Sequence, residues 1–148
     1  MSVLNELKAL MLRAPRLTLA TAESMTVGLV QAKVGGISGA SEFFLGGITA
    51  YTLEQKVRHL AVNRAAARRV NCVSAQVAAE MARGACALFD SDLGVATTGY
   101  AEPSEVDGVA EPFAWWALAR RRRPFAQPVR RAQGPEPAEG VRAGNSKR

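Results

Sequence analysis

The sequence predicts an α/β fold: a single domain, built as a three-layer α/β/α sandwich in which helices cover both faces of one sheet. Two observations lead to this prediction. Short runs rich in β-branched and apolar residues alternate along the chain with longer segments in which apolar residues recur at helical spacing. The chain has 148 residues, of which 48% are hydrophobic and 22% are charged, and this length and composition suit one globular domain.

Apolar periodicity and capping residues place the elements. The stripe of Leu4, Leu7 and Met11 is typical of a helix, and Ser74 is a good N-cap for a later one. Helices are expected over residues 3–13, from Ser24 to about Val34, around Lys56, and over residues 75–89. Strands are expected over residues 17–21, 43–51, 93–98 and 113–118.

The net charge of +6 comes from one end of the chain. Residues 1–119 carry ten Lys or Arg and eleven Asp or Glu, whereas residues 120–148 carry nine and two. The nearly neutral body gives no electrostatic support for nucleic-acid binding by the folded domain. Because residues 120–148 are rich in Pro and Arg and poor in apolar residues, we expect a domain over residues 1–119 followed by a basic, mostly irregular tail.

Location and metal content are also constrained. The apolar runs fall well short of the roughly 20 residues that a membrane span needs, so no membrane partner is expected. Glu6 and Lys8 interrupt what would be the apolar region of a signal peptide, and we therefore expect a cytoplasmic protein. Cys72 and Cys86 have neither CxxC spacing nor a His cluster nearby, so the pattern predicts no metal site and no disulfide framework.

Four side chains in one short α/β segment have the chemistry of a hydrolase: Ser24, Ser41, Tyr51 and Lys56. We expect them to converge on one cleft, because a nucleophile and its base must meet for this chemistry to be possible. A serine near neutral pH needs a base to take its proton, and a lysine serves when burial depresses its pKa. The only histidine, His59, has no partner motif. The structural alternatives are Ser24 as a helix N-cap, Tyr51 at the edge of the core and Lys56 as an exposed helix cation.

An ordered set of short motifs surrounds these residues. It consists of Thr21-Ala22-Glu23-Ser24-Met25-Thr26-Val27-Gly28, Gly39-Ala40-Ser41, Tyr51-Thr52-Leu53-Glu54-Gln55-Lys56, Val73-Ser74 and Thr98-Gly99-Tyr100-Ala101-Glu102-Pro103. In order and spacing, from about residue 4 to residue 119, the set resembles the C-terminal domain of the competence/damage-inducible protein CinA. Stand-alone members of that family are nicotinamide mononucleotide amidohydrolases.

The resemblance implies a cofactor-free hydrolase that converts the carboxamide of nicotinamide mononucleotide to a carboxylate and releases ammonia. It implies a small-molecule nucleotide as the partner, and we also expect a homo-oligomer. Of the two serines we favour Ser24 as the nucleophile, with Lys56 as the base and Tyr51 as a proton relay or oxyanion donor. Glu23 either tunes Lys56 or bonds backbone amides. Substrate-binding residues are expected at Thr21, Glu23, Thr98 and Gly99.

Several positions depart from the family pattern. Met25 replaces a cysteine, while Val27 and Glu102 each replace a glycine. The segment 104–113 is acidic where the family has glycines and a lysine. A carboxylate close to a phosphate weakens phosphate binding. The alternatives to a mononucleotide amidohydrolase are therefore a divergent member with a changed substrate and a non-catalytic module for ligand binding or oligomerisation.

Overall fold

The computed structural model describes residues 2–121 and 125–133, the second range by its backbone alone. Its elements are α1 (Val3–Leu12), β1 (Leu19–Glu23), α2 (Leu29–Gly35), the 3-10 turn η1 (Ala40–Glu42), β2 (Phe44–Thr49), α3 (Leu53–Leu60), α4 (Arg64–Arg69), α5 (Ala75–Phe89), β3 (Leu93–Tyr100), β4 (Phe113–Arg120) and β5 (Phe125–Gln133). Each helix and strand that the sequence predicts is present. The elements α4 and β5 have no counterpart among the predicted ones.

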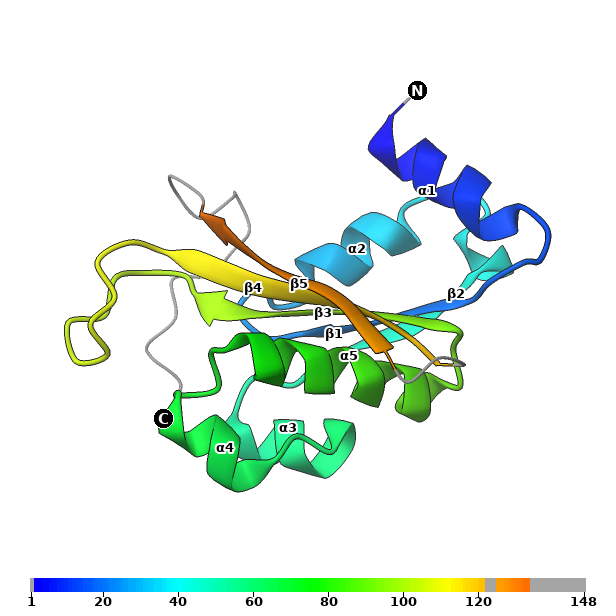
Figure 1. Cartoon of the computed structure of the whole chain (residues 1–148). Helices are drawn as coiled ribbons and strands as arrows, with labels where there is room; N and C mark the ends of the chain where they lie inside the picture. The colour runs from blue at the N-terminus through cyan, green and yellow to red at the C-terminus, as the bar shows by residue number, and fades with distance from the viewer. Residues whose placement is uncertain (1, 122–124, 134–148) are drawn as a thin grey trace.

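The strands form one five-stranded sheet in the order β2-β1-β3-β4-β5 (Figure 1). Strands β2, β1 and β3 are parallel, whereas β4 and β5 continue the sheet antiparallel. In this register Glu23 lies opposite Thr49, and Ala22 lies opposite Ala96. The residues that follow β1 and β2 therefore meet the end of β3 at one edge of the sheet, which we call the carboxyl edge.

Helices cover both faces of the sheet, which confirms the three-layer architecture. In Figure 1 helices α1 and α2 lie on one face, and α3, α4 and α5 lie on the other. Alternation along β1 sends Ala20 and Ala22 into the core under α5 and sends Leu19 into the second core, under α1 and α2. Helix α5 packs so close to the sheet that a Cβ on Gly94 would lie 2.1 Å from the Ala82 carbonyl oxygen. None of the described helices is long and apolar enough to span a bilayer.

The segment expected to be an irregular tail contains strand β5, which pairs antiparallel with β4 over most of its length. Without this strand, the outer edge of β4 would leave a row of backbone N–H and C=O groups unpaired. Pro128 lies at a shift of register between β4 and β5, a place where a strand tolerates proline. The expectation of irregular structure is therefore wrong for residues 125–133. The remainder of the segment, residues 122–124 and 134–148, lies outside the described residues.

Helix α2 begins later than the sequence predicts, because the chain first makes a turn. The Val27 amide donates to the Ser24 carbonyl over 3.2 Å, and the Leu29 amide donates to the Thr26 carbonyl over 3.0 Å. Val27 and Gly28 both have left-handed backbones, with φ of 49° and 92°, and Gly28 is the N-cap residue of α2. The interpretation of Ser24 as the N-cap of this helix is therefore wrong.

Candidate active site

Lys56 lies at the centre of a buried polar cluster at the carboxyl edge. Its helix, α3, begins after Thr52, whose hydroxyl accepts a hydrogen bond from the Gln55 amide. The Lys56 Nζ lies 2.8 Å from Ser24 Oγ. The side chains of both residues are buried, with an exposed fraction of 0%. The predicted approach of these two residues is therefore present in the structure.

Two main-chain carbonyls complete the surroundings of the amine. The Lys56 Nζ donates to the Ala50 oxygen over 2.8 Å and to the Tyr51 oxygen over 2.7 Å. Both carbonyls belong to the segment that leaves β2, so the path of the chain after this strand aims them at the amine. Sequence reasoning named the Tyr51 side chain, which is half-buried, but it missed the carbonyls because every residue carries the same C=O group.

Burial makes the amine of Lys56 a weaker base than that of an ordinary lysine. Desolvation lowers its pKa from 10.5 to about 8, while the coulombic influence of Cys72 acts in the opposite direction. Once Lys56 loses a proton, its two remaining N–H bonds can go to the two carbonyls, and its lone pair then faces Ser24 Oγ. The carbonyls thus orient the neutral amine to accept the proton of Ser24.

Glu23 has a structural role next to this cluster. Its carboxylate, 1% exposed, accepts hydrogen bonds from the amides of Val30 over 2.8 Å and Gln31 over 2.9 Å, and from the Thr26 hydroxyl over 2.6 Å. It therefore fills the N-terminus of α2, where free amides and the helix dipole favour a negative charge. The prediction that Glu23 bonds backbone amides is confirmed.

The other predicted substrate-binding residues have different surroundings. The Thr98 hydroxyl donates to the Cys72 carbonyl over 2.6 Å and fastens β3 to the loop before α5. Gly99 lies within β3, where a Cβ would come 2.2 Å from the Phe113 carbonyl oxygen, so close strand packing requires a glycine there. Thr21 lies beside Gly47, and its buried hydroxyl has no hydrogen-bond partner within the described residues. A ligand contact by these three residues stays a prediction.

Ser41 lies at the opposite edge of the sheet from Ser24. It belongs to η1, which precedes β2, and the Leu19 amide at the start of β1 donates to the Phe43 carbonyl over 2.8 Å. Five residues of β1 separate Leu19 from Ser24, which corresponds to about 16 Å along a strand. Lys8 holds this region to α1 by donating to the Ser38 carbonyl. The expectation that both serines meet Lys56 in one cleft is therefore wrong for Ser41.

The loop before α5 connects the cluster to the acidic segment that follows β3. Asn71 and Cys72 are consecutive residues in the left-handed region, with φ of 47° and 61°. Cys72 is 1% exposed and acts electrostatically on Lys56. The Asn71 side-chain amide lies 3.4 Å from the Tyr100 hydroxyl and 3.4 Å from an Asp107 oxygen. Across residues 2–121 and 125–133, no group of His, Cys, Asp and Glu side chains is arranged to hold a metal ion.

Comparison with known proteins assigns the chain to one family. Residues 2–139 match the CinA C-terminal domain, and the chain belongs to this family. It is 43% identical over 109 residues to a CinA-like protein of Picosynechococcus, a match that covers 74% of this chain and 26% of the relative. A putative competence-damage inducible protein of Halothermothrix orenii is 43% identical over 86 residues, which is 58% of this chain and 21% of the relative. The chain thus matches about a quarter of the length of these relatives.

Solved structures agree with this assignment. The chain superimposes on a CinA superfamily protein from Escherichia coli with a TM-score of 0.78 and 30% identity, over 93% of this chain and 80% of the other. A competence damage-inducible protein from Klebsiella pneumoniae gives a TM-score of 0.82 with 27% identity, over 93% of this chain and 85% of the other. The recognition of the family from the ordered motifs is confirmed.

Proposed function

We propose that this protein hydrolyses a carboxamide of the nicotinamide type to a carboxylate and ammonia, with Ser24 as the nucleophile and Lys56 as the base. The observation that carries the proposal is the buried contact of 2.8 Å between Lys56 Nζ and Ser24 Oγ, with two carbonyls orienting the amine. The lowered pKa of Lys56 supports it, because a base works best when its pKa lies near the operating pH. The family resemblance points to nicotinamide mononucleotide as the reference substrate.

The reaction has two halves. Lys56 takes the hydroxyl proton while Ser24 Oγ forms a bond to the amide carbon, and the same proton then passes to the departing nitrogen as the C–N bond breaks and ammonia leaves. In the second half Lys56 takes a proton from water, the hydroxide attacks the serine ester, and the C–O bond to Ser24 breaks with return of the proton to Oγ. One amide and one water thereby give one carboxylate and one ammonium ion.

The turn after Ser24 supports the oxyanion step. The amides of Met25 and Thr26 directly follow the nucleophile, and neither has a hydrogen-bond acceptor among the described residues. Such amides are suitable donors to a tetrahedral oxyanion, as is the amide that follows the nucleophile in other hydrolases. Because Ser24 is fully buried, the proposal requires that a neighbouring segment move to admit the amide. The half-exposed turn over residues 25–28 is the segment that we expect to move.

The test is ammonia release from nicotinamide mononucleotide by the pure protein and its variants. Ser24→Ala and Lys56→Met should each lower kcat/KM by at least about a thousandfold, since they remove the nucleophile and its base. For the wild type, kcat/KM should rise tenfold per pH unit up to about pH 8 and then level off, because only neutral Lys56 accepts the proton.

Ser41→Ala is the matched control. It is the same chemical change at an exposed serine of the other sheet edge, so its kcat/KM should equal that of the wild type. Loss of activity in Ser41→Ala with retention in Ser24→Ala would reverse the assignment of the nucleophile. Release of ammonia by Lys56→Met at the wild-type rate would remove Lys56 from the mechanism.

A further inference from the structure

The turn over residues 24–28 crosses the carboxyl edge from one face of the sheet to the other. Ser24 meets Lys56 on the face that α3 and α5 cover. The carboxylate of Glu23, one residue earlier, lies on the opposite face, where it bonds the start of α2 and the Thr26 hydroxyl. The amides of Met25 and Thr26 therefore lie between a nucleophile on one face and an anchored hydroxyl on the other.

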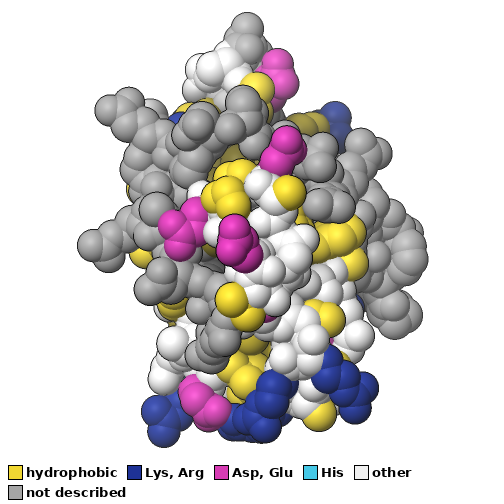
Figure 2. Space-filling model, turned by 90° about the vertical axis from the view of Figure 1, so that its left-hand side faces the viewer, with side chains coloured by type: hydrophobic (Ala, Val, Ile, Leu, Met, Phe, Trp, Pro, Cys, Tyr) yellow, Lys and Arg dark blue, Asp and Glu magenta, His cyan; other side chains and the backbone are white. Residues whose placement is uncertain are grey.

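Main-chain amides are the groups that this turn can offer to an oxyanion. No charged residue belongs to residues 24–28, and the threonine hydroxyl of the turn is already hydrogen-bonded. Figure 2 views the molecule from the side of the carboxyl edge, and the Lys and Arg side chains seen there gather at its lower end. The conformation of the turn's backbone therefore decides how well its amides stabilise a negative charge.

Thr26 is fastened to two adjacent strands at once. Its Oγ lies 2.6 Å from Glu23 Oε1 and 2.7 Å from Thr97 Oγ. A hydroxyl has one proton and a carboxylate only accepts, so the proton of Thr26 goes to Glu23. The Thr97 hydroxyl is therefore the donor in the second bond. These two contacts tie the middle of the turn to the end of β1 and to β3.

The turn needs such fastening for two reasons. Val27, next to Thr26, has a left-handed backbone with φ of 49°, a conformation that a β-branched residue keeps only when its surroundings hold it. Ser24 is fully buried, so the turn must open to admit an amide and then return to the same conformation in every catalytic cycle. A hydrogen bond from β3, the central strand of the sheet, gives the turn a fixed point to which it returns.

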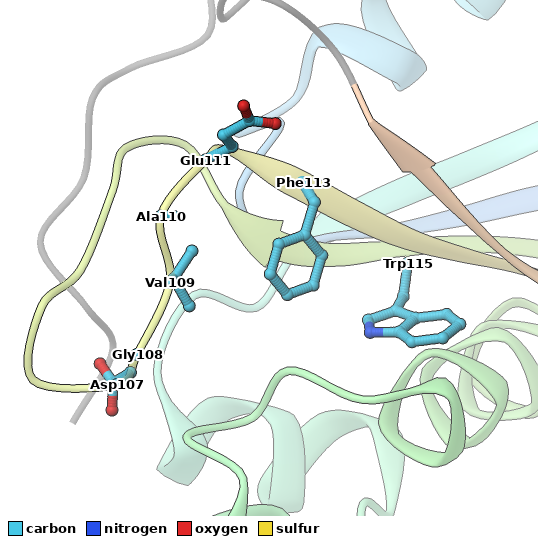
Figure 3. A pocket seen from close by; sticks show the side chains of 7 residues that line it. All are labelled: Asp107, Gly108, Val109, Ala110, Glu111, Phe113 and Trp115. Carbon is cyan, nitrogen blue, oxygen red and sulfur yellow. The ribbon is translucent and has the colours of Figure 1, made fainter.

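Thr97 lies on the face of the sheet opposite to Ser24. Its side chain follows that of Val95 on the same side of β3, and Val95 packs against the core under α1 and α2. Trp115 packs instead against the core under α5, and Figure 3 shows its ring in the lining of a hollow of about 430 Å³. An effect of Thr97 on the reaction at Ser24 must therefore pass through Thr26.

We propose that Thr97 is a positioning residue for hydrolysis at Ser24: its hydrogen bond to Thr26 holds the turn in the conformation that presents the amides of Met25 and Thr26 to the oxyanion. The inference rests on the proposed amide hydrolysis. A planar amide carries little charge on its oxygen, whereas the tetrahedral intermediate carries a full negative charge. Loss of the Thr97 bond therefore weakens binding of the tetrahedral species and leaves binding of the planar amide unchanged.

The first test measures ammonia release from nicotinamide mononucleotide by Thr97→Val, which removes the hydroxyl and keeps the branched side chain. Its kcat should fall about tenfold or more while KM changes by less than about twofold, since a misplaced turn affects the transition state. Thr97→Ser keeps the donor and should restore most of the activity. The pH profile of kcat/KM should still level off at about pH 8, because Lys56 lies on the other face.

Thr49→Val is the matched control. Thr49 ends β2 at the same edge, but its hydroxyl accepts from Gln31 of α2 and not from the turn, so kcat should equal that of the wild type. Thr26→Val removes the acceptor of the Thr97 bond, and adding Thr97→Val to it should lower kcat by less than about twofold further. A further loss of about tenfold in that background would show that Thr97 acts by another route and would overturn the inference.

The second test needs no turnover. Pyridine-3-boronic acid has boron in place of the carboxamide carbon, and Ser24 Oγ can add to the boron while Lys56 takes the hydroxyl proton, which gives a tetrahedral boronate anion. Boron NMR distinguishes this form from the planar acid. Thr97→Val should weaken the binding about fivefold or more and leave the affinity for nicotinamide within about twofold of the wild type. Thr49→Val should change neither affinity, and Ser24→Ala should abolish the tetrahedral signal.

The outcomes separate this inference from the proposed function. Ammonia release at the wild-type kcat by Thr97→Val, or an equal loss in Thr97→Val and Thr97→Ser, overturns the inference and leaves the proposed function in place. If the wild type releases no ammonia from any amide, the proposed function fails and the boronate decides. Weaker tetrahedral binding by Thr97→Val then supports the role of Thr97 in holding the turn, whereas equal or absent tetrahedral binding overturns it. Thr97→Ala provides the same test if Thr97→Val does not fold.

Discussion

The burial of Lys56 predicts an unusual dependence of stability on pH. The folded-state pKa is about 8, whereas the exposed lysine of the unfolded chain keeps a pKa of about 10.5. Between these two values the unfolded state binds more protons than the folded state, so the free energy of unfolding rises with pH. The full effect amounts to about 3 kcal/mol, and about 2 kcal/mol of it falls between pH 7 and pH 9.5.

The assay is urea denaturation at about pH 7 and about pH 9.5 for the wild type and for Lys56→Met. Other titrating groups contribute to both proteins, so the difference between their pH effects isolates Lys56. Both proteins should carry Cys72→Ala, because Cys72 acts electrostatically on Lys56 and would otherwise contribute to the difference between the two proteins. From about pH 7 to about pH 9.5, the free energy of unfolding should rise by about 2 kcal/mol more in the protein that keeps Lys56 than in the Lys56→Met variant. Equal gains in the two proteins would refute a buried amine with a lowered pKa.

The remaining predictions concern three positions near the site. Val27→Gly should stabilise the protein by about 0.5–1 kcal/mol in thermal denaturation, because a β-branched residue is strained at φ 49° where glycine is not; a loss of stability would contradict this. Gly99→Ala should destabilise the fold by about 1–3 kcal/mol in urea, since its Cβ would clash with the Phe113 carbonyl; unchanged stability with weaker substrate binding would instead support the predicted ligand contact. Glu23→Gln should lower the free energy of unfolding by about 1 kcal/mol, because it removes the charge at the start of α2, and should leave the pH profile of kcat/KM unchanged. A profile displaced along the pH axis would show instead that Glu23 tunes the pKa of Lys56.

The sequence by itself determined the class of fold, because hydrophobic periodicity is a local signal. The stripe over α1 and the N-cap Ser74 before α5 place these helices correctly. Strands β2 and β3 also lie where their residue types predict them. The ordered motifs were enough to identify the family, since no tertiary information is needed to compare spacing along a chain.

The sequence could not predict β5 or the start of α2. Strand β5 forms because residues 125–133 pair with the free edge of β4, although their composition favours irregular structure. The start of α2 depends on Glu23, which reaches forward to the amides of Val30 and Gln31 and so fixes the turn before the helix. In both places a contact between segments overrode the local preference.

Only the tertiary structure decided which of the candidate residues meet. By residue type alone Ser24 and Ser41 were equal candidates for the nucleophile, but the parallel register of β1 and β2 puts Ser24 at one edge of the sheet and Ser41 at the other. The same register brings the carbonyls of Ala50 and Tyr51 to the amine, which no side-chain pattern reveals. The chemistry of each side chain follows from the sequence alone. The distance between two residues far apart in the chain depends instead on how the strands pair, and that pairing follows from the packing of the whole sheet.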